Sequence, residues 1–166
     1  MTDLHFNSAA SVTGWTPIDD RVMGGVSSSQ LVFHQDGYAV FAGQVSSDHG
    51  GGFASVRHSD LALGDESTVG YRLQVRGDGK RYKFNLCMDA ALDGVNYQAV
   101  FQPPAGRWVD IVLPLAVFSA RYRGNPVPTA PALQPHQVRQ VGWMVADAQT
   151  GPFELAIRAV TCLHGR

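Results

Sequence analysis

Hydrophobic and polar residues alternate along much of the chain. In the stretch 69–76, Tyr71, Leu73 and Val75 occupy every second position between polar residues, and the stretch 81–88 repeats this pattern. A period of two places hydrophobic side chains on one face of a β-strand and polar side chains on the other. The pattern predicts nine or ten strands, at 30–34, 38–46, 52–58, 69–76, 81–88, 96–102, 107–113, 138–146 and 153–162, with a short one at 4–6.

Glycine-containing turns separate these stretches. Gln35-Asp36-Gly37 favours a tight hairpin between 30–34 and 38–46, and the Arg-Gly-Asp-Gly sequence at 76–79 predicts another between 69–76 and 81–88. Each predicted strand carries one polar face, which is typical of antiparallel strands that are buried on one side only. The sequence therefore predicts an all-β sandwich of antiparallel strands. Its polar faces lie outside, where a curved sheet can form a shallow groove.

The segment 119–137 interrupts the series of strands. It contains four prolines, Pro126, Pro128, Pro131 and Pro135, and shows no clear periodicity. A connection of this length in a compact domain is often a binding loop or a lid. A rigid strap that crosses between the two sheets is the other interpretation, and both stay open.

Length and charge limit the class of protein. The chain has 166 residues, with 13 basic and 14 acidic side chains and a formal net charge of −1. A length of this kind suits a single domain over 1–166. The charge balance argues against a nucleic-acid binder with a broad basic face. No run approaches the ~18 apolar residues of a membrane span, so no membrane span is expected. The N-terminus shows no secretory signal.

The two cysteines, Cys87 and Cys162, lie in apolar runs without metal-ligand neighbours. We expect them to be buried free thiols in a reducing compartment, which predicts a cytoplasmic location.

Motifs for catalysis, metals and nucleotides are not apparent. No serine stands in a Gly-x-Ser-x-Gly elbow, and the six histidines show no metal-ligand spacing. The glycine runs at 24–25 and 50–52 lack the helix or the Lys-Ser/Thr of a phosphate loop, and are better explained as bends. The sequence therefore predicts a protein that is not an enzyme and has neither a cofactor nor a metal.

Several local sequences, taken together, resemble one known family. Trp15 is followed by Asp-Arg-Val-Met-Gly-Gly-Val-Ser at 20–27, and later stretches include Gly-Gly-Phe-Ala-Ser-Val-Arg at 51–57 and Gly-Pro-Phe-x-Leu at 151–155. In this order, they are similar to the complex I intermediate-associated protein 30 domain. The resemblance implies a galactose-binding-like jelly-roll β-sandwich. The best-known members are mitochondrial assembly factors that act as chaperones for respiratory complex I.

The lack of a catalytic motif and the resemblance together predict a non-catalytic binding domain. The expected partner is a protein, such as an assembly intermediate of a respiratory complex. The predicted contact surface combines the 20–27 segment with Asp20 and Arg21, one polar strand face shared by Arg76 and Asn85, and the 121–124 loop with Arg123, together with Arg57 and Tyr82. Asp20 and Arg57 also have a structural interpretation, in which they pair with backbone groups or with each other at the strand entries.

Two other functions stay open. A carbohydrate-binding module would use the polar outer face, with Tyr82, Tyr97 or Trp108 as rings that stack on a sugar. Trp143 lies within Val-Gly-Trp-Met-Val and is expected in the core instead. An enzyme that uses Asp20, Arg57 and Tyr82 is the least favoured of the three functions.

Overall fold

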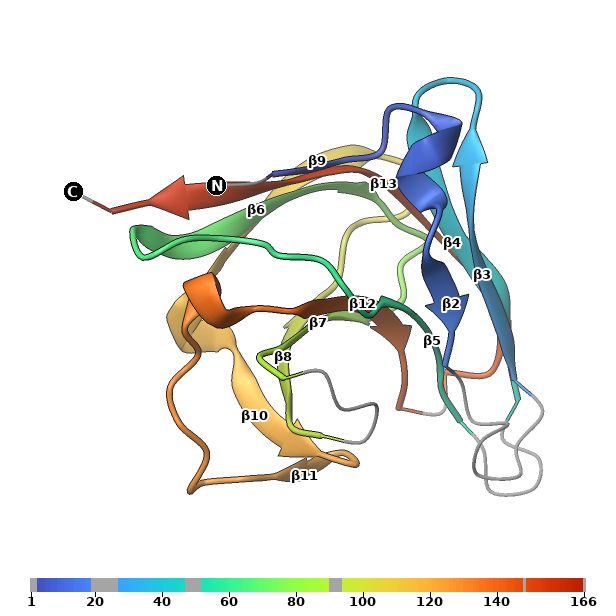
Figure 1. The fold of residues 1–166 in the computed structure, drawn as a ribbon. Coiled ribbons are helices and arrows are strands. Elements are labelled where there is room, and N and C mark those ends of the chain that lie inside the picture. Colours follow the sequence, from blue (N-terminus) through green and yellow to red (C-terminus); the bar gives the residue numbers. More distant parts are fainter. Residues whose placement is uncertain (1–2, 19–26, 47–51, 90–93, 148, 166) are drawn as a thin grey trace.

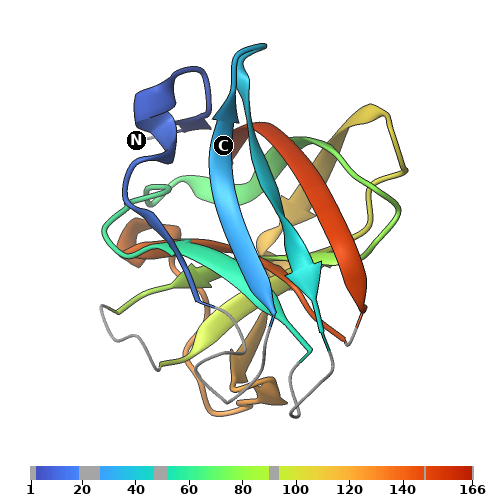
Figure 2. The same cartoon turned by 90° about the vertical axis from the view of Figure 1, so that its right-hand side faces the viewer.

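The computed structural model describes residues 3–18, 27–46, 52–89, 94–147 and 149–165, and these form two antiparallel β-sheets packed face to face (Figure 1). The six-stranded sheet has the spatial order β3 (Ser28–His34), β4 (Tyr38–Val45), β13 (Gly151–His164), β6 (Thr68–Arg76) and β9 (Trp108–Pro114), and β1 (Leu4–His5) pairs with β13. Figure 2 shows β3, β4 and β13 side by side.

The second sheet is seven-stranded. Its spatial order is β11 (Asn125–Pro126), β10 (Ser119–Tyr122), β8 (Asn96–Phe101), β7 (Tyr82–Cys87), β12 (Gln140–Val145), β5 (Ala54–His58) and β2 (Trp15–Pro17). Short 3₁₀ helices occupy Ala9–Val12, Leu115–Val117 and Pro135–Gln137. No helix within the described ranges is long and apolar enough to cross a membrane.

The inward faces of both sheets form one aromatic core. Trp143 is fully buried, as the sequence predicts, and its ring centroid lies 4.8 Å from that of Phe84. Phe41 and Phe153 make a similar contact at 4.9 Å. Full burial of a large apolar side chain stabilises a fold by about 1.5–3 kcal/mol. Burial of the hydrophobic side chains that alternate along the sequence therefore stabilises the packing of the two sheets.

The predicted fold class is confirmed, but the strand count is too low. The described residues contain 13 strands, whereas the alternation predicts nine or ten. The missed strands are β2, β10 and β11, which have three, four and two residues. A segment of two to four residues is too short to show a period of two. These segments form strands because they pair at the edges of the larger sheet.

The segment 119–137 does not cross between the sheets, because β10, β11 and the following β12 all belong to the seven-stranded sheet, and the binding-loop interpretation stays a prediction. Its first part forms β10 and β11, which extend the seven-stranded sheet, and its last part forms the helix at Pro135–Gln137. Between them, the Tyr97 hydroxyl donates a hydrogen bond to the Pro131 carbonyl oxygen at 2.5 Å. The segment is thus anchored against β8.

One of the two predicted hairpins is confirmed. The turn at 35–37 joins β3 to β4, and Gly37 has a φ of +94° and donates its N–H to the His34 carbonyl oxygen. The hairpin predicted at 76–79 is wrong, because β6 belongs to the six-stranded sheet and β7 to the seven-stranded sheet. The chain crosses between the sheets there.

The Asp78 carboxylate holds this crossing in place. It accepts hydrogen bonds from the Tyr82 hydroxyl at 2.8 Å, the Lys80 N–H at 3.1 Å and the Glu154 N–H at 2.8 Å. The Asp78 side chain therefore joins the crossing segment to β7 and to β13. This crossing places the polar face of β6 and the polar face of β7 on opposite sides of the molecule.

Candidate functional site

A line of polar side chains crosses the outer face of the seven-stranded sheet. The strand register sets six residues directly opposite one another on adjacent strands, in the order Thr16, Arg57, Gly142, Asn85, Gln98 and Ser119. We call this line the polar row. Adjacent strands lie ~4.8 Å apart, so the row is about 24 Å long. That length suits an extended ligand that lies across the strands.

Arg57 is positioned by neutral amides of the same face. Its guanidinium donates hydrogen bonds to the Asn96 Oδ1 at 3.2 Å and to the Gln140 Oε1 at 3.5 Å. Gln140 is fully buried, and its Nε2 donates to the Asp89 carbonyl oxygen at 2.8 Å. A buried amide that is bonded at both ends fixes the arginine that it contacts.

Asn85 is the anomalous member of the row. Its side chain is 4% exposed, and its Oδ1 has no hydrogen-bond partner in the described part of the chain. Its Nδ2 donates only to the Met144 sulfur, at 3.8 Å. A buried acceptor without a donor costs about 1–3 kcal/mol, and native structures rarely retain one without a reason.

A cavity of about 280 Å³ borders the polar row. It shares Gln98 and Ser119 with the row, and its other lining residues are Lys83, Val100, Arg121, Gly124 and Asp147. Asp147 pairs with Lys83 at 3.8 Å. Arg121 donates to the Ser119 hydroxyl and to the Gly124 carbonyl oxygen, at 3.1 and 3.3 Å. The cavity is therefore lined by both hydrogen-bond donors and acceptors, several of which bond one another.

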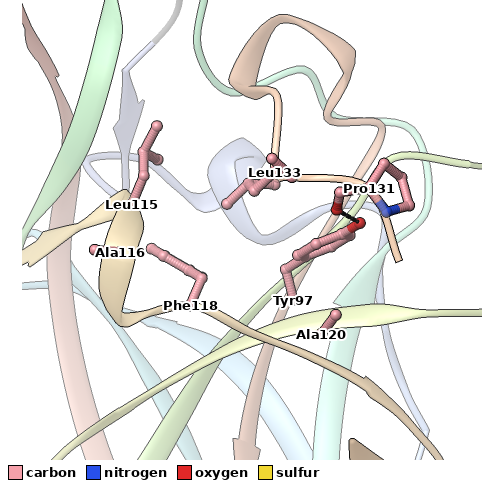
Figure 3. Close-up of a pocket in the computed structure, with 8 residues that line it drawn as sticks. Tyr97, Leu115, Ala116, Phe118, Ala120, Pro131 and Leu133 are labelled. Atoms are coloured by element: carbon pink, nitrogen blue, oxygen red, sulfur yellow. Dashed lines mark hydrogen bonds between the residues drawn. The ribbon is translucent and has the colours of Figure 1, made fainter. Parts of the chain in front are cut away.

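A second, apolar cavity of about 400 Å³ lies on the inner side of β8 and β10 (Figure 3). Its lining residues are Tyr97, Leu115, Ala116, Phe118, Ala120, Pro131, Ala132 and Leu133. Burial raises the pKa of Tyr97, and the Asp89 carboxylate adds to this effect. The ring therefore stays neutral and its hydroxyl holds the Pro131 segment.

The structure separates the residues of the predicted contact surface. Arg57 and Asn85 share the polar row, with Gly142 between them. Arg76 lies on the six-stranded sheet, so the expectation that it shares a face with Asn85 is wrong in its geometry. The error comes from the hairpin predicted at 76–79. Tyr82 is fully buried between the sheets, and burial raises its pKa, so it does not line an outer surface.

The other predicted residues lie elsewhere. Arg123 is at the turn between β10 and β11, with a φ of +50°, and its guanidinium lies 5.6 Å from the centre of the Tyr122 ring. Asp20 and Arg21, with most of the 20–27 motif, lie outside the described residues. Whether Arg57 and Asn85 bind a ligand stays a prediction.

Sequence reasoning missed Gln98, Gln140 and Ser119. Gln98 and Gln140 lie in predicted strands, where nothing in the sequence distinguishes a buried amide from an exposed one, and Ser119 begins the segment without clear periodicity. Their alignment follows from the order in which β10, β8, β7 and β12 pair, which the sequence does not reveal.

A serine, a histidine and an aspartate meet near the C-terminus. The Ser67 hydroxyl contacts the Asp65 Oδ1 at 2.7 Å and the His164 Nδ1 at 2.8 Å. The Asp65 carboxylate also approaches the same His164 nitrogen, at 3.6 Å. A catalytic triad needs the serine and the carboxylate on different ring nitrogens, so this contact lacks triad geometry. Within the described ranges, no group of three or more His, Cys, Asp or Glu residues is arranged to hold a metal ion.

Comparison with protein families gives one family match and one relative for this chain. The family model described as "Complex I intermediate-associated protein 30" matches residues 4–157. The chain belongs to the complex I intermediate-associated protein 30 family. A relative in this comparison is an uncharacterised protein of Schizosaccharomyces pombe, which is 27% identical over 167 residues, 88% of this chain and 76% of the yeast protein.

Solved structures with the same fold as this family member include carbohydrate-binding modules. The family 11 module of a cellulosomal cellulase from Clostridium thermocellum has a TM-score of 0.70 at 15% identity, over 99% of this chain and 95% of the module. The same module in complex with a β-1,3-1,4-mixed-linked tetrasaccharide has a TM-score of 0.69 at 16% identity, over 98% of each chain. At this identity, the similarity establishes the galactose-binding-like fold alone.

Proposed function

We propose that this chain is a non-catalytic binding domain that holds a protein partner, as an assembly factor or chaperone of the kind for which its family is named. The polar row is the proposed contact surface. The observation that carries the proposal is the buried Asn85 Oδ1, which lacks a donor among the residues that the structure describes. A donor from a partner would recover the free energy that this oxygen loses in the unbound protein.

The groups around Asn85 suit a polypeptide partner. Arg57, Lys83 and Arg121 offer N–H donors on the same side of the sheet, and Gln98 adds an amide that both donates and accepts. An extended peptide presents alternating N–H and C=O groups, which these side chains match. Among the described residues, neither Cys87 nor Cys162 is in a disulfide, which supports the proposed cytoplasmic location.

Carbohydrate binding is the second candidate, and one observation favours it. The architecture follows that of the family 11 module bound to a mixed-linked tetrasaccharide over nearly the whole of both chains. Against it, the three rings expected to stack on a sugar do not lie on the polar row. Tyr82 is in the core, Tyr97 lines the inner cavity, and Trp108 lies on the other sheet.

Affinity capture from membranes of the native cell tests the main proposal. The wild-type chain is compared with Asn85→Leu, and with Arg72→Ala as a matched variant on the outer face of the six-stranded sheet. Wild type and Arg72→Ala should recover subunits of a respiratory-complex intermediate, and Asn85→Leu should lose them. Equal recovery by all three proteins would remove the polar row from the proposal. Recovery of no such subunit, together with saturable binding of a mixed-linked glucan oligosaccharide, would favour the second candidate.

A further inference from the structure

A second group of side chains crosses the outer face of the six-stranded sheet. Five adjacent strands each contribute one residue, in the spatial order His34 (β3), Tyr38 (β4), Arg158 (β13), Arg76 (β6) and Trp108 (β9). We call this group the arginine–aromatic row. It lies on the opposite side of the molecule from the polar row, and the proposed function does not use it.

The members of this row contact one another closely. The His34 and Tyr38 rings are stacked at 4.5 Å with an interplanar angle of 6°, and the Tyr38 ring meets the Trp108 ring edge-on at 5.2 Å. The Arg76 guanidinium lies 5.3 Å from the centre of the Tyr38 ring and 5.1 Å from that of Trp108. The Arg158 guanidinium stacks on Trp108 at 3.9 Å.

A β-bulge in β13 brings Arg158 into the row. The register of β13 against β6 shifts between Ile157 and Ala159, so Arg158 is an extra residue on its strand. Ile157 and Val160 both face the core as a result, and Arg158 points outward. The Phe6 N–H bonds the Arg158 carbonyl oxygen at 2.9 Å, which fixes the bulge. Bulges commonly re-aim a side chain at a binding site.

Neither arginine of the row has a carboxylate partner among the described residues. Arg76 donates one hydrogen bond, from Nη2 to the Tyr38 hydroxyl at 3.2 Å, and Arg158 forms no side-chain hydrogen bond with the described residues. Asp110 and Glu154 lie on the same face, but neither forms an ion pair with either arginine within the described ranges. Asp36 is engaged by His34, at 3.7 Å. Two cations therefore contact one indole ring, and no anion of the described residues compensates their charge.

We infer that the arginine–aromatic row is a binding site for an oxyanion, either a carboxylate or a phosphate group. Stacking on Trp108 holds the Arg158 guanidinium in a fixed plane and leaves its N–H edge free for two parallel hydrogen bonds. Arg76 lies on the same ring and adds a second positive charge. The ligand group is therefore planar or tetrahedral, negatively charged, and able to accept bonds from both guanidinium groups.

NMR titration of the full chain tests this inference. The probes are inorganic phosphate and a blocked tri-glutamate peptide, each added at constant ionic strength, and the readout is the indole N–H resonance of Trp108. A saturable shift in the millimolar range is expected. Arg158→Lys keeps the charge but loses the planar guanidinium, so it should weaken binding about tenfold. Arg72→Lys, on the same strand as Arg76 but outside the row, should change binding less than about twofold.

The outcomes separate the possibilities. Saturation with phosphate alone would assign a phosphate group, and saturation with the peptide would assign a carboxylate. Shifts that stay linear with both probes would overturn the inference. So would equal losses in Arg158→Lys and Arg72→Lys, because the effect would then come from the general charge of the surface. Loss of capture in Asn85→Leu leaves this titration unchanged, so the two proposals fail independently.

Discussion

Gly142 lies directly opposite Asn85 on the neighbouring strand, and directly opposite Arg57 on its other side. A β-carbon on Gly142 would lie 3.7 Å from the Asn85 β-carbon and 3.2 Å from the Val56 carbonyl oxygen. Gly142 and Asn85 are both buried, so a side chain at position 142 would crowd the Val56 carbonyl oxygen and contact Asn85. Glycine therefore allows Arg57 and Asn85 to flank this strand at the centre of the polar row.

Replacement of Asn85 by leucine should not destabilise the fold. The substitution removes a buried oxygen that has no donor in the described part of the chain, and leucine has the same branched shape with the same number of side-chain heavy atoms. We expect the free energy of unfolding in urea to stay the same or to rise by about 1 kcal/mol.

Replacement of Gln140 by leucine provides the contrast. Gln140 is also buried, but it bonds both Arg57 and the Asp89 carbonyl oxygen. Its loss removes one acceptor of the Arg57 guanidinium and one donor to the Asp89 carbonyl oxygen, so the free energy of unfolding should fall by about 1–3 kcal/mol. An equal loss in Asn85→Leu would show that Asn85 has a donor in solution and would remove the main support for the polar row.

The loss of stability on replacing Gly43 or Gly37 by alanine should depend on which atoms the new β-carbon meets. Gly43 lies against the Ser28 backbone across the β3–β4 pair, so Gly43→Ala forces a collision with a carbonyl oxygen and should cost about 3 kcal/mol. Gly37 faces open space, and Gly37→Ala should cost only about 1–2 kcal/mol because of its positive φ. Denaturant unfolding of both variants measures the difference. The reverse order would mean that β3 and β4 separate to accept the new side chain at Gly43.

The alternation of the sequence predicts the fold well, because each long strand buries one face. The sequence of β13 also indicates where its β-bulge lies. Core positions fall on odd numbers through Phe153, Leu155 and Ile157, and on even numbers at Val160 and Cys162. An extra residue must therefore lie where the core positions change from odd to even numbers. This residue is Arg158, which belongs to the arginine–aromatic row.

Strand order limits what the sequence predicts about the candidate site. The 76–79 stretch contains the residues of a hairpin turn, yet Asp78 binds Tyr82 and the β13 backbone instead. Local sequence does not encode that choice, because the competing contact is 76 residues away. For this reason the sequence predicts Arg76 and Asn85 on one face, whereas they lie on opposite sheets.

Loss of the Asp78 carboxylate should weaken the crossing between the sheets. Asp78→Ala leaves the Tyr82 hydroxyl and the Glu154 N–H without their acceptor. We expect the free energy of unfolding to fall by about 2–3 kcal/mol. Tyr82→Phe in the Asp78→Ala background removes one of these donors and should recover part of the loss. No recovery in the double variant would contradict this role for Asp78.

The Cys162 thiol should make stability depend on alkaline pH. Burial raises the pKa of this thiol to about 12, and the nearby Asp3 carboxylate adds to the effect. The Cys162 N–H also donates to the Asp3 Oδ1 at 2.9 Å. In the unfolded chain a thiol has a pKa of about 8.5.

The sign of the effect follows from this difference. The folded state retains a proton that the unfolded state releases above pH ~8.5, so the stabilisation is complete below that pH and is lost progressively towards pH ~12. The free energy of unfolding of the wild type should therefore fall between pH 8 and pH 10 more steeply than that of Cys162→Ala. A thiol-specific reagent should likewise react slowly with the folded chain at pH 8 and rapidly after unfolding. Parallel pH dependence in the two proteins would show that Cys162 ionises in the folded state as readily as in the unfolded one, and that its burial is not maintained in solution.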